Sequence, residues 1–279
     1  MNSRPGVRGA VNARLNIRCL GRFSIEGCSG EVSGSEARRG RQLIGYLVAH
    51  GYAVAERRVL AEAFWPDADA DVTHHRLHLV ASAARSTLRR ALSGIEAIAC
   101  VNGGYAWHPD VCVESDVARL LESARCTDPA KLREAAQYEY GEFLAGQEGD
   151  WLDPIRLRCA AARSTLLQRL AEAAYASGEL DEALHRGLEL TALDPAHESA
   201  TRLIMNCFSR LDQPMQAYNA FVVLEQFLGR RLAIAPTHET RQLLDEILKR
   251  DRRDTVMPWT DAASIVRRRH ASSGAGSHY

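Results

Sequence analysis

Histidine, serine and arginine side chains in the amino-terminal third of the chain have the chemistry needed to bind DNA. His75, His78 and Ser82 fall in the first half of one predicted helix, where side chains contact base edges when a helix enters the major groove. Each good contact of this kind discriminates against a wrong base by about 1–3 kcal/mol. Arginines instead bind phosphates, which fixes position and makes affinity depend on salt. The phosphate candidates are Arg38, Arg39, Arg85 and Arg89.

Two other interpretations of these side chains stay open. A helix surface rich in arginine can simply be solvated, and periodicity alone does not separate that case from a phosphate-binding face. His74 and His78 stand four residues apart, a spacing that suits a metal site on a helix. No glutamate lies between them and no third ligand is indicated, so we expect no metal.

The pattern of apolar residues predicts the elements that position these side chains. Residues 15–20 and 22–25 are short β-prone runs that predict a small antiparallel sheet. Helices are predicted over RRGRQLIGYLVAHG, capped by Ser35 or Glu36, then over residues 56–65 and 74–92. The third helix carries an apolar stripe at spacings of three and four, formed by Leu77, Val80, Ala84, Leu88 and Leu92.

A hairpin follows the three predicted helices. AIACV and YAWHP are β-prone runs separated by Asn102 and two glycines, which favour the positive φ angles of a tight hairpin turn. Strands, three helices and a hairpin, in that order, are typical of a winged helix-turn-helix. We therefore predict such a DNA-binding domain over residues 15–110, with Asn102 at the wing tip touching the DNA backbone.

The chain from residue 115 to 250 is predicted to be entirely helical. YASGELDEALHRGLELTALDP and SRLDQPMQAYNAF match about one 34-residue period apart, with Ala183 and Leu184 equivalent to Ala217 and Tyr218. This pattern favours a TPR-like array of helix pairs with a concave binding surface. Residues 1–14 and 251–279 are polar and lack periodicity, and we expect them to be disordered.

Composition limits the class of protein. The 279 residues are 46% apolar and 25% charged with a formal net charge of zero, which suits two globular domains. Seven scattered cysteines indicate a reducing compartment. The absence of a long apolar run or signal peptide predicts a cytoplasmic protein with no membrane partner.

Enzyme motifs are missing from the sequence. There is no P-loop, no Rossmann fingerprint and no nucleophile elbow, and no local pattern supports a Ser-His-Asp triad. We therefore expect no catalysis and no cofactor. Trp65, Trp107 and Trp151 stand in apolar or turn contexts, where anchoring a core is a better expectation than stacking on bases.

The two halves together resemble the AfsR/SARP transcriptional regulators, which join an OmpR-type winged helix to a bacterial transcriptional activation domain. The resemblance runs over about residues 15–248, through LNIRCLGRFSIEG, LAEAFWPDAD, GGYAWHP, YGEFLAG, DWLDPIRLR and LGRRLAIAPTHETRQLLDEIL. It implies sequence-specific binding to promoter DNA, often by paired protomers at direct repeats, and activation through RNA polymerase. HHRLHLVASAAR departs from many relatives because its first half is poor in arginine, so the base-reading residues rest on helix geometry.

Two alternatives to a DNA-binding activator remain. A TPR-type adaptor could retain the winged helix as a protein-interaction module that no longer binds DNA. A ligand-sensing regulator could instead bind a small molecule in its helical domain and change its affinity for DNA in response. Salt-sensitive DNA binding would argue against the first, and thermal stabilisation by a metabolite extract would favour the second.

Overall fold

The computed structural model describes residues 13–33 and 40–255. The chain divides into two compact units, one ending at Leu166 and the other beginning at Leu167. This division differs from the predicted domain boundary near residues 110–115, because the strand that follows the boundary pairs with the first strand of the chain. The domain assignment stays a prediction. Within the described residues, no helix has the length and apolarity needed to cross a membrane.

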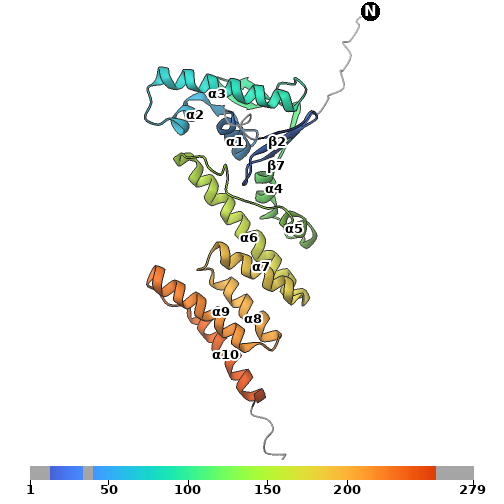
Figure 1. The fold of residues 1–279 in the computed structure, drawn as a ribbon, viewed down its shortest axis with the longest axis vertical. Coiled ribbons are helices and arrows are strands. Elements are labelled where there is room, and N and C mark those ends of the chain that lie inside the picture. Colours follow the sequence, from blue (N-terminus) through green and yellow to red (C-terminus); the bar gives the residue numbers. More distant parts are fainter. Residues whose placement is uncertain (1–12, 34–39, 256–279) are drawn as a thin grey trace, which may run out of the picture. The chain divides into compact units, whose positions relative to one another are not determined.

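A four-stranded sheet opens the first unit, in the order β3-β2-β1-β7 (Figure 1). Its strands are β1 (Ala13–Arg18), β2 (Ser24–Gly27), β3 (Gly30–Ser33) and β7 (Val111–Ser115). The predicted antiparallel pairing of the first two strands is confirmed. In β1, Leu15 and Ile17 alternate with solvent-facing residues and are fully buried, as one-sided packing of a sheet requires.

Three helices follow, and the third is the longest. They are α1 (Arg41–His50), α2 (Arg57–Phe64) and α3 (Ala70–Ala91). The predicted cap residues of α1, Ser35 and Glu36, lie outside the described residues. Gly40 precedes α1 where its backbone crosses α3, and a Cβ there would stand 2.4 Å from the Cα of Ala84. Glycine therefore permits a helix contact that a larger residue would block.

The predicted hairpin is confirmed. Strands β5 (Ile98–Val101) and β6 (Gly104–Trp107) pair antiparallel, and Asn102 and Gly103 between them have φ angles of 48° and 78°. These angles are those of a type I′ turn, which Asn-Gly favours. The short strand β4 (Ala55–Glu56) adds to the other side of β6, an addition that the sequence pattern did not predict.

The rest of the first unit covers the sheet and α1 with helical and irregular segments. Its helices are α4 (Asp116–Ser123), α5 (Pro129–Ala136), the short 3-10 turn η2 (Asp150–Leu152) and the first part of α6 (Asp153–Ser177). The prediction of a continuous helical texture was wrong over residues 137–149. There, Leu144 N–H donates to Cys19 O at 2.8 Å and Gly21 N–H donates to Glu142 O at 2.8 Å.

Aromatic side chains join this irregular segment to the three-helix core. The ring of Trp151 lies 5.7 Å from that of Tyr46 on α1 and 5.3 Å from that of Phe64 on α2. Trp107 on β6 is only 4% exposed, and Trp65 contacts Phe64 edge to face. The expected core position is confirmed for Trp107, whereas Trp65 and Trp151 are half-buried and contact the ring of Phe64.

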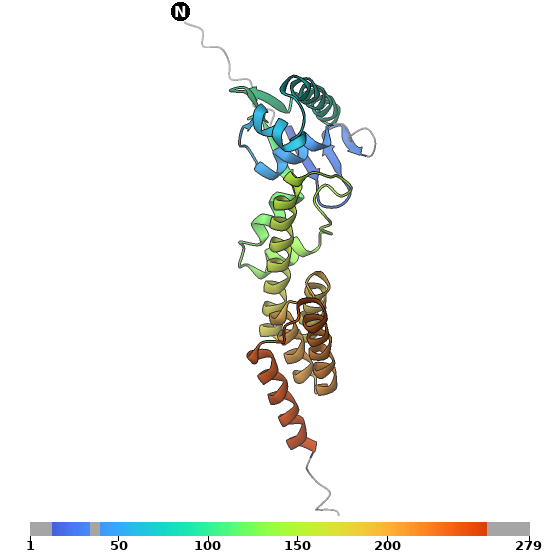
Figure 2. The ribbon, with the colours of Figure 1, turned by 90° about the vertical axis from the view of Figure 1, so that its left-hand side faces the viewer.

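The second unit contains the end of α6 and a series of helices, each packed against the next, that lie side by side in Figure 1 and are turned by 90° in Figure 2. They are α7 (Leu180–Leu193), α8 (Glu198–Arg210), α9 (Pro214–Phe227), the π-type turn η3 (Leu228–Leu232) and α10 (His238–Thr255). Ala183 and Ala217, the predicted repeat equivalents, are both fully buried in cores between neighbouring helices. Their burial agrees with a stacked repeat, while the TPR-like assignment itself stays a prediction.

Candidate nucleic-acid interface

The exposed side of α3 carries the predicted base-contacting residues. Leu77, Ala84 and Leu88 are at most 2% exposed, so the predicted apolar stripe packs into the core of the first unit. His75, His78 and Ser82 are all exposed along the first half of the same helix. The helix therefore presents their hydrogen-bonding groups to solvent as a single row of polar side chains.

An apolar side chain that sequence reasoning missed lies within this row. Leu79 is 55% exposed, one helical turn after His75 and three residues before Ser82, so it shares their side of α3. An apolar side chain in such a place is suited to the methyl group of thymine. Its position off the buried stripe was the available sequence signal.

The base of the hairpin is held beside α3 by Arg85. Its Nε donates to the carbonyl oxygen of Ile98 at 3.3 Å, and its second terminal nitrogen lies 3.0 Å from Cys100 Sγ. The same guanidinium lies 5.4 Å from the centre of the Tyr105 ring, within the range of a cation–π contact. Arg85 thus has a structural role that its predicted phosphate contact does not include.

Arg57 also belongs to this group, although it was not among the predicted site residues. This exposed first residue of α2 places its guanidinium 5.5 Å from the Tyr105 ring. The pairing of Ala55 with Tyr105 brings the two together, and no local sequence pattern reveals that pairing. Two guanidiniums therefore meet one aromatic ring at the base of the hairpin.

The pKa of Cys100 is affected by the two guanidiniums at the base of the hairpin. Its exposed thiol has a pKa below the ordinary value because Arg85 hydrogen-bonds to the sulfur and because Arg57 adds a second hydrogen bond and positive charge. Slight burial acts in the opposite direction and does not cancel the effect. The two guanidiniums thus stabilise the thiolate form of Cys100.

Glu96 pairs with both predicted phosphate-binding arginines of α3. Its carboxylate lies 3.3 Å from Arg85 Nε and also forms a close ion pair with Arg89. Arg89 is 52% exposed and Arg85 is 26% exposed. A phosphate approaching this side of α3 must therefore compete with a carboxylate that sequence spacing did not connect to either arginine.

The other predicted contacts have different outcomes. Asn102 is exposed at the hairpin tip, as predicted. Arg38 and Arg39 lie outside the described residues, so their predicted phosphate contacts stay predictions. Within the residues that are described, no group of three or more His, Cys, Asp or Glu side chains has an arrangement that could hold a metal ion.

Comparisons with known proteins match this chain to bacterial transcriptional regulators. A family model described as the bacterial transcriptional activator domain matches residues 113–248. The regulatory protein AfsR of Streptomyces griseus is 26% identical over 231 residues, covering 79% of this chain and 23% of that protein. AfsR of Streptomyces coelicolor is 25% identical over 233 residues, covering 80% and 23%. The chain thus spans about a quarter of the length of these curated relatives.

The fold has a solved counterpart. The structure of Mycobacterium tuberculosis EmbR in complex with a low affinity phosphopeptide aligns with a TM-score of 0.69 and 20% identity, covering 85% of this chain and 66% of that chain. It supports the fold alone, a winged helix followed by helices. The activator-domain match and the two AfsR relatives make this chain similar to the AfsR/SARP transcriptional regulators over most of its described length.

Proposed function

We propose that this protein is a transcriptional activator whose first unit binds promoter DNA in a sequence-specific manner. The observation that carries the proposal is the exposed polar side of α3, next to a hairpin whose base is flanked by the guanidiniums of Arg57 and Arg85. With α3 in the major groove, His75, His78 and Ser82 would face base edges and Leu79 a thymine methyl group. The hairpin, with Asn102 at its tip, would lie against the adjacent backbone.

Phosphate contacts in this proposal come from arginines around that surface. Arg85 and Arg89 lie on α3, and Arg57 lies at the start of α2 beside the hairpin. The predicted contacts of Arg38 and Arg39 would add to this set of phosphate contacts. For Arg85 and Arg89 to bind a phosphate, the phosphate must displace the Glu96 carboxylate or share the two guanidiniums with it. Neutralising one phosphate changes the slope of log affinity against log salt by about 0.9, so each contact has a measurable signature.

The helical residues 115–250 would then act on the transcription machinery. We propose that this TPR-like domain recruits RNA polymerase, while paired protomers bind repeated half-sites. The match of residues 113–248 to the activator-domain model supports this role. The similarity to the AfsR regulators and to the activator-domain model supports the proposal of a cytoplasmic regulator without catalytic activity.

The first experiment is selection of genomic DNA fragments on the purified chain, followed by sequencing of the retained fraction. A few intergenic sites with repeated half-sites are expected. Uniform retention, or none across a salt series, would refute sequence-specific binding and favour the protein-interaction adaptor. A run-off transcription assay on a retained promoter then tests activation with RNA polymerase present.

Variants separate base contacts from phosphate contacts. H78A should weaken binding to the selected site by about 1–3 kcal/mol while leaving affinity for unrelated DNA unchanged. R57A should weaken both and lower the salt slope by about one contact. R125A, at an exposed arginine after α4, is the matched control. Equal losses for H78A on selected and unrelated DNA would remove His78 from the set of base contacts.

Glu96 provides a test with the opposite sign. E96Q keeps the size of the side chain but removes the negative charge that pairs with Arg85 and Arg89. If these arginines bind phosphate, the variant should bind DNA more tightly and with a steeper salt dependence. Unchanged affinity in a correctly folded variant would leave both arginines with a structural role only.

A further inference from the structure

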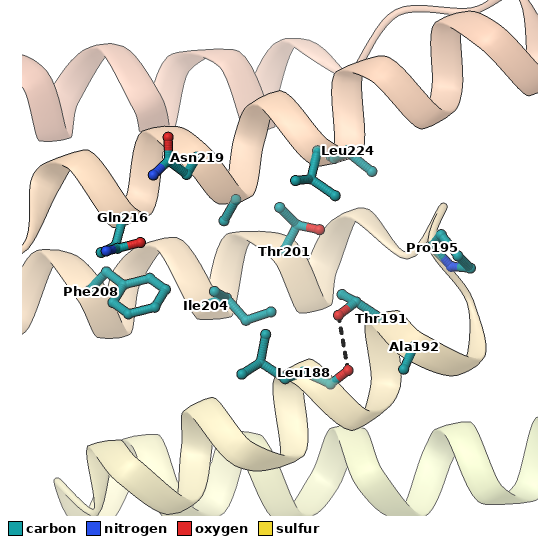
Figure 3. A pocket seen from close by; sticks show the side chains of 12 residues that line it. Leu188, Thr191, Ala192, Pro195, Thr201, Ile204, Phe208, Gln216, Asn219 and Leu224 are labelled. Carbon is teal, nitrogen blue, oxygen red and sulfur yellow. Dashed lines mark hydrogen bonds between the residues drawn. The ribbon is translucent and has the colours of Figure 1, made fainter.

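We propose that the second unit binds a neutral, largely apolar small molecule between α7 and α9, a function separate from DNA binding. A cavity of about 410 Å³ lies there, with α8 as its floor (Figure 3). Pockets for small molecules and cofactors typically enclose about 300–1,000 Å³ and are mostly apolar with a few polar groups. The cavity matches both properties.

The floor and walls of the cavity come from three helices. Ile204 and Phe208 extend along α8, and Leu188 faces them from α7 (Figure 3). Val223 lines the cavity from α9. From Thr201 to Phe208 the floor extends about 10 Å along the axis of α8, at 1.5 Å per residue. That length suits a compact molecule and would hold only about three residues of an extended peptide.

The lining excludes charge. None of the residues around the cavity in these described helices has an ionisable side chain, although charged residues make up 25% of the chain. An ionised ligand would lose hydration there without gaining a partner, which is costly. Gln216 and Asn219 contribute amides from α9, so a hydroxyl, carbonyl or amide on an otherwise apolar ligand would find hydrogen-bond partners.

The apolar walls remain partly in contact with water. Leu188 is 53% exposed and Val223 is 68% exposed, while Ile204 below them is only 3% exposed. Covering these side chains with an apolar molecule removes their surface from water, which is favourable in proportion to area. The cavity therefore combines a buried floor with exposed apolar rims, so a bound molecule gains contact on three sides.

A pair of fluorescent probes tests the proposed chemistry on the full chain. N-phenylnaphthylamine is neutral, and anilinonaphthalene sulfonate has the same ring system with an added negative charge. The neutral probe should bind saturably with one site per chain, and the sulfonate at least about tenfold more weakly. Equal affinities, or non-saturable binding of the neutral probe, would overturn the proposal.

Substitutions on α9 locate the site. V223D and V223K each place a charge on the wall of the cavity, and both should weaken the neutral probe by about tenfold or more. M215D is the matched control, because Met215 is also on α9 and 63% exposed but does not line the cavity. Equal effects of V223D and M215D would refute this location, provided that circular dichroism shows both variants folded.

Sedimentation of the same proteins distinguishes a different occupant. If the unmodified chain forms a dimer that V223D dissociates, a second copy covers these walls and the small-molecule proposal fails. If V223D leaves the oligomeric state unchanged while the neutral probe is lost, the proposal stands. Because neither readout uses DNA, failure here is distinct from failure of promoter binding.

Discussion

Replacing Asp116 by alanine should strongly destabilise the first unit. This side chain, at the start of α4, is only 7% exposed and accepts hydrogen bonds from three backbone N–H groups. Its oxygens lie 2.9 Å from Cys19 N, 2.8 Å from Leu20 N and 2.8 Å from Val117 N. Asp116 thereby ties the end of β1 to the first turn of α4.

The size of the effect follows from the three donors. A buried donor left without an acceptor costs about 1–3 kcal/mol, which would give several kcal/mol if the losses were additive. Two effects reduce this sum. Burial raises the pKa of Asp116 despite the three hydrogen bonds, so the carboxylate is itself costly to bury, and water can enter the space that alanine leaves. We therefore expect a loss of about 3 kcal/mol for D116A.

D116N should be milder, at about 1–2 kcal/mol. Its amide keeps one acceptor oxygen but turns a donor toward a backbone N–H. S115A removes only the cap in which Ser115 Oγ accepts from Ala118 N at 3.1 Å, a loss of about 1 kcal/mol. The expected order of destabilisation is therefore D116A, then D116N, then S115A.

Urea unfolding followed by tryptophan fluorescence measures the effect. The described tryptophans, at positions 65, 107 and 151, all belong to the first unit, and a W259F background removes the remaining one. A loss of about 3 kcal/mol corresponds to a fall in Tm of about 6–12 °C for a unit of this size. D110A is the control, since that side chain is 70% exposed. A D116A transition within about 0.5 kcal/mol of the control would refute the reasoning.

Three further predictions concern other parts of the chain. G40A should cost about 1–3 kcal/mol in urea unfolding, because its Cβ would stand 2.4 Å from the backbone of Ala84; an unchanged midpoint would contradict this. Burial raises the pKa of Glu198, but hydrogen bonds from Thr237 and Thr240 outweigh it and lower the pKa overall. The Glu198 carboxylate should therefore stabilise the folded chain at neutral pH and lose this effect below about pH 4. Unfolding followed by far-UV circular dichroism should show E198Q less stable than the unmodified chain at neutral pH and equally stable in acid. Cys100 should react with iodoacetamide faster than the other exposed cysteines, because the thiolate is the reactive form, and R85Q should slow it; equal rates in mass spectrometry would count against the Arg85 hydrogen bond.

Sequence periodicity predicted the elements that depend on local residue order. The spacing of Leu77, Ala84 and Leu88 predicted the buried side of α3, and hence the exposure of His75 and Ser82 opposite it. The hairpin was equally predictable, because the positive φ of Asn102 arises from turn chemistry within a few residues. Such features need no knowledge of distant parts of the chain.

Contacts between distant residues were not predictable in the same way. β7 pairs in parallel with β1, matching Val111 with Ala13, and VCVES contains nothing that selects this partner. The irregular segment that contains Leu144 is likewise held by a hydrogen bond to Cys19. In both cases the position of the segment depends on a surface that another element has already formed. The residues of the segment alone therefore do not predict its partner.

Arg85 shows why the candidate site was predicted only in outline. The sequence placed it correctly within the third predicted helix, but spacing does not distinguish solvation, phosphate binding and an internal contact. The structure adds the third role, because this guanidinium bonds to Ile98 and Cys100 of the hairpin and pairs with Glu96. R85A would therefore remove a hairpin support together with any phosphate contact, and weaker DNA binding by that variant would not identify its cause. E96Q changes the charge near Arg85 while leaving the contacts to Ile98 and Cys100 in place, so the substitution of the partner, not of the arginine, separates the two roles.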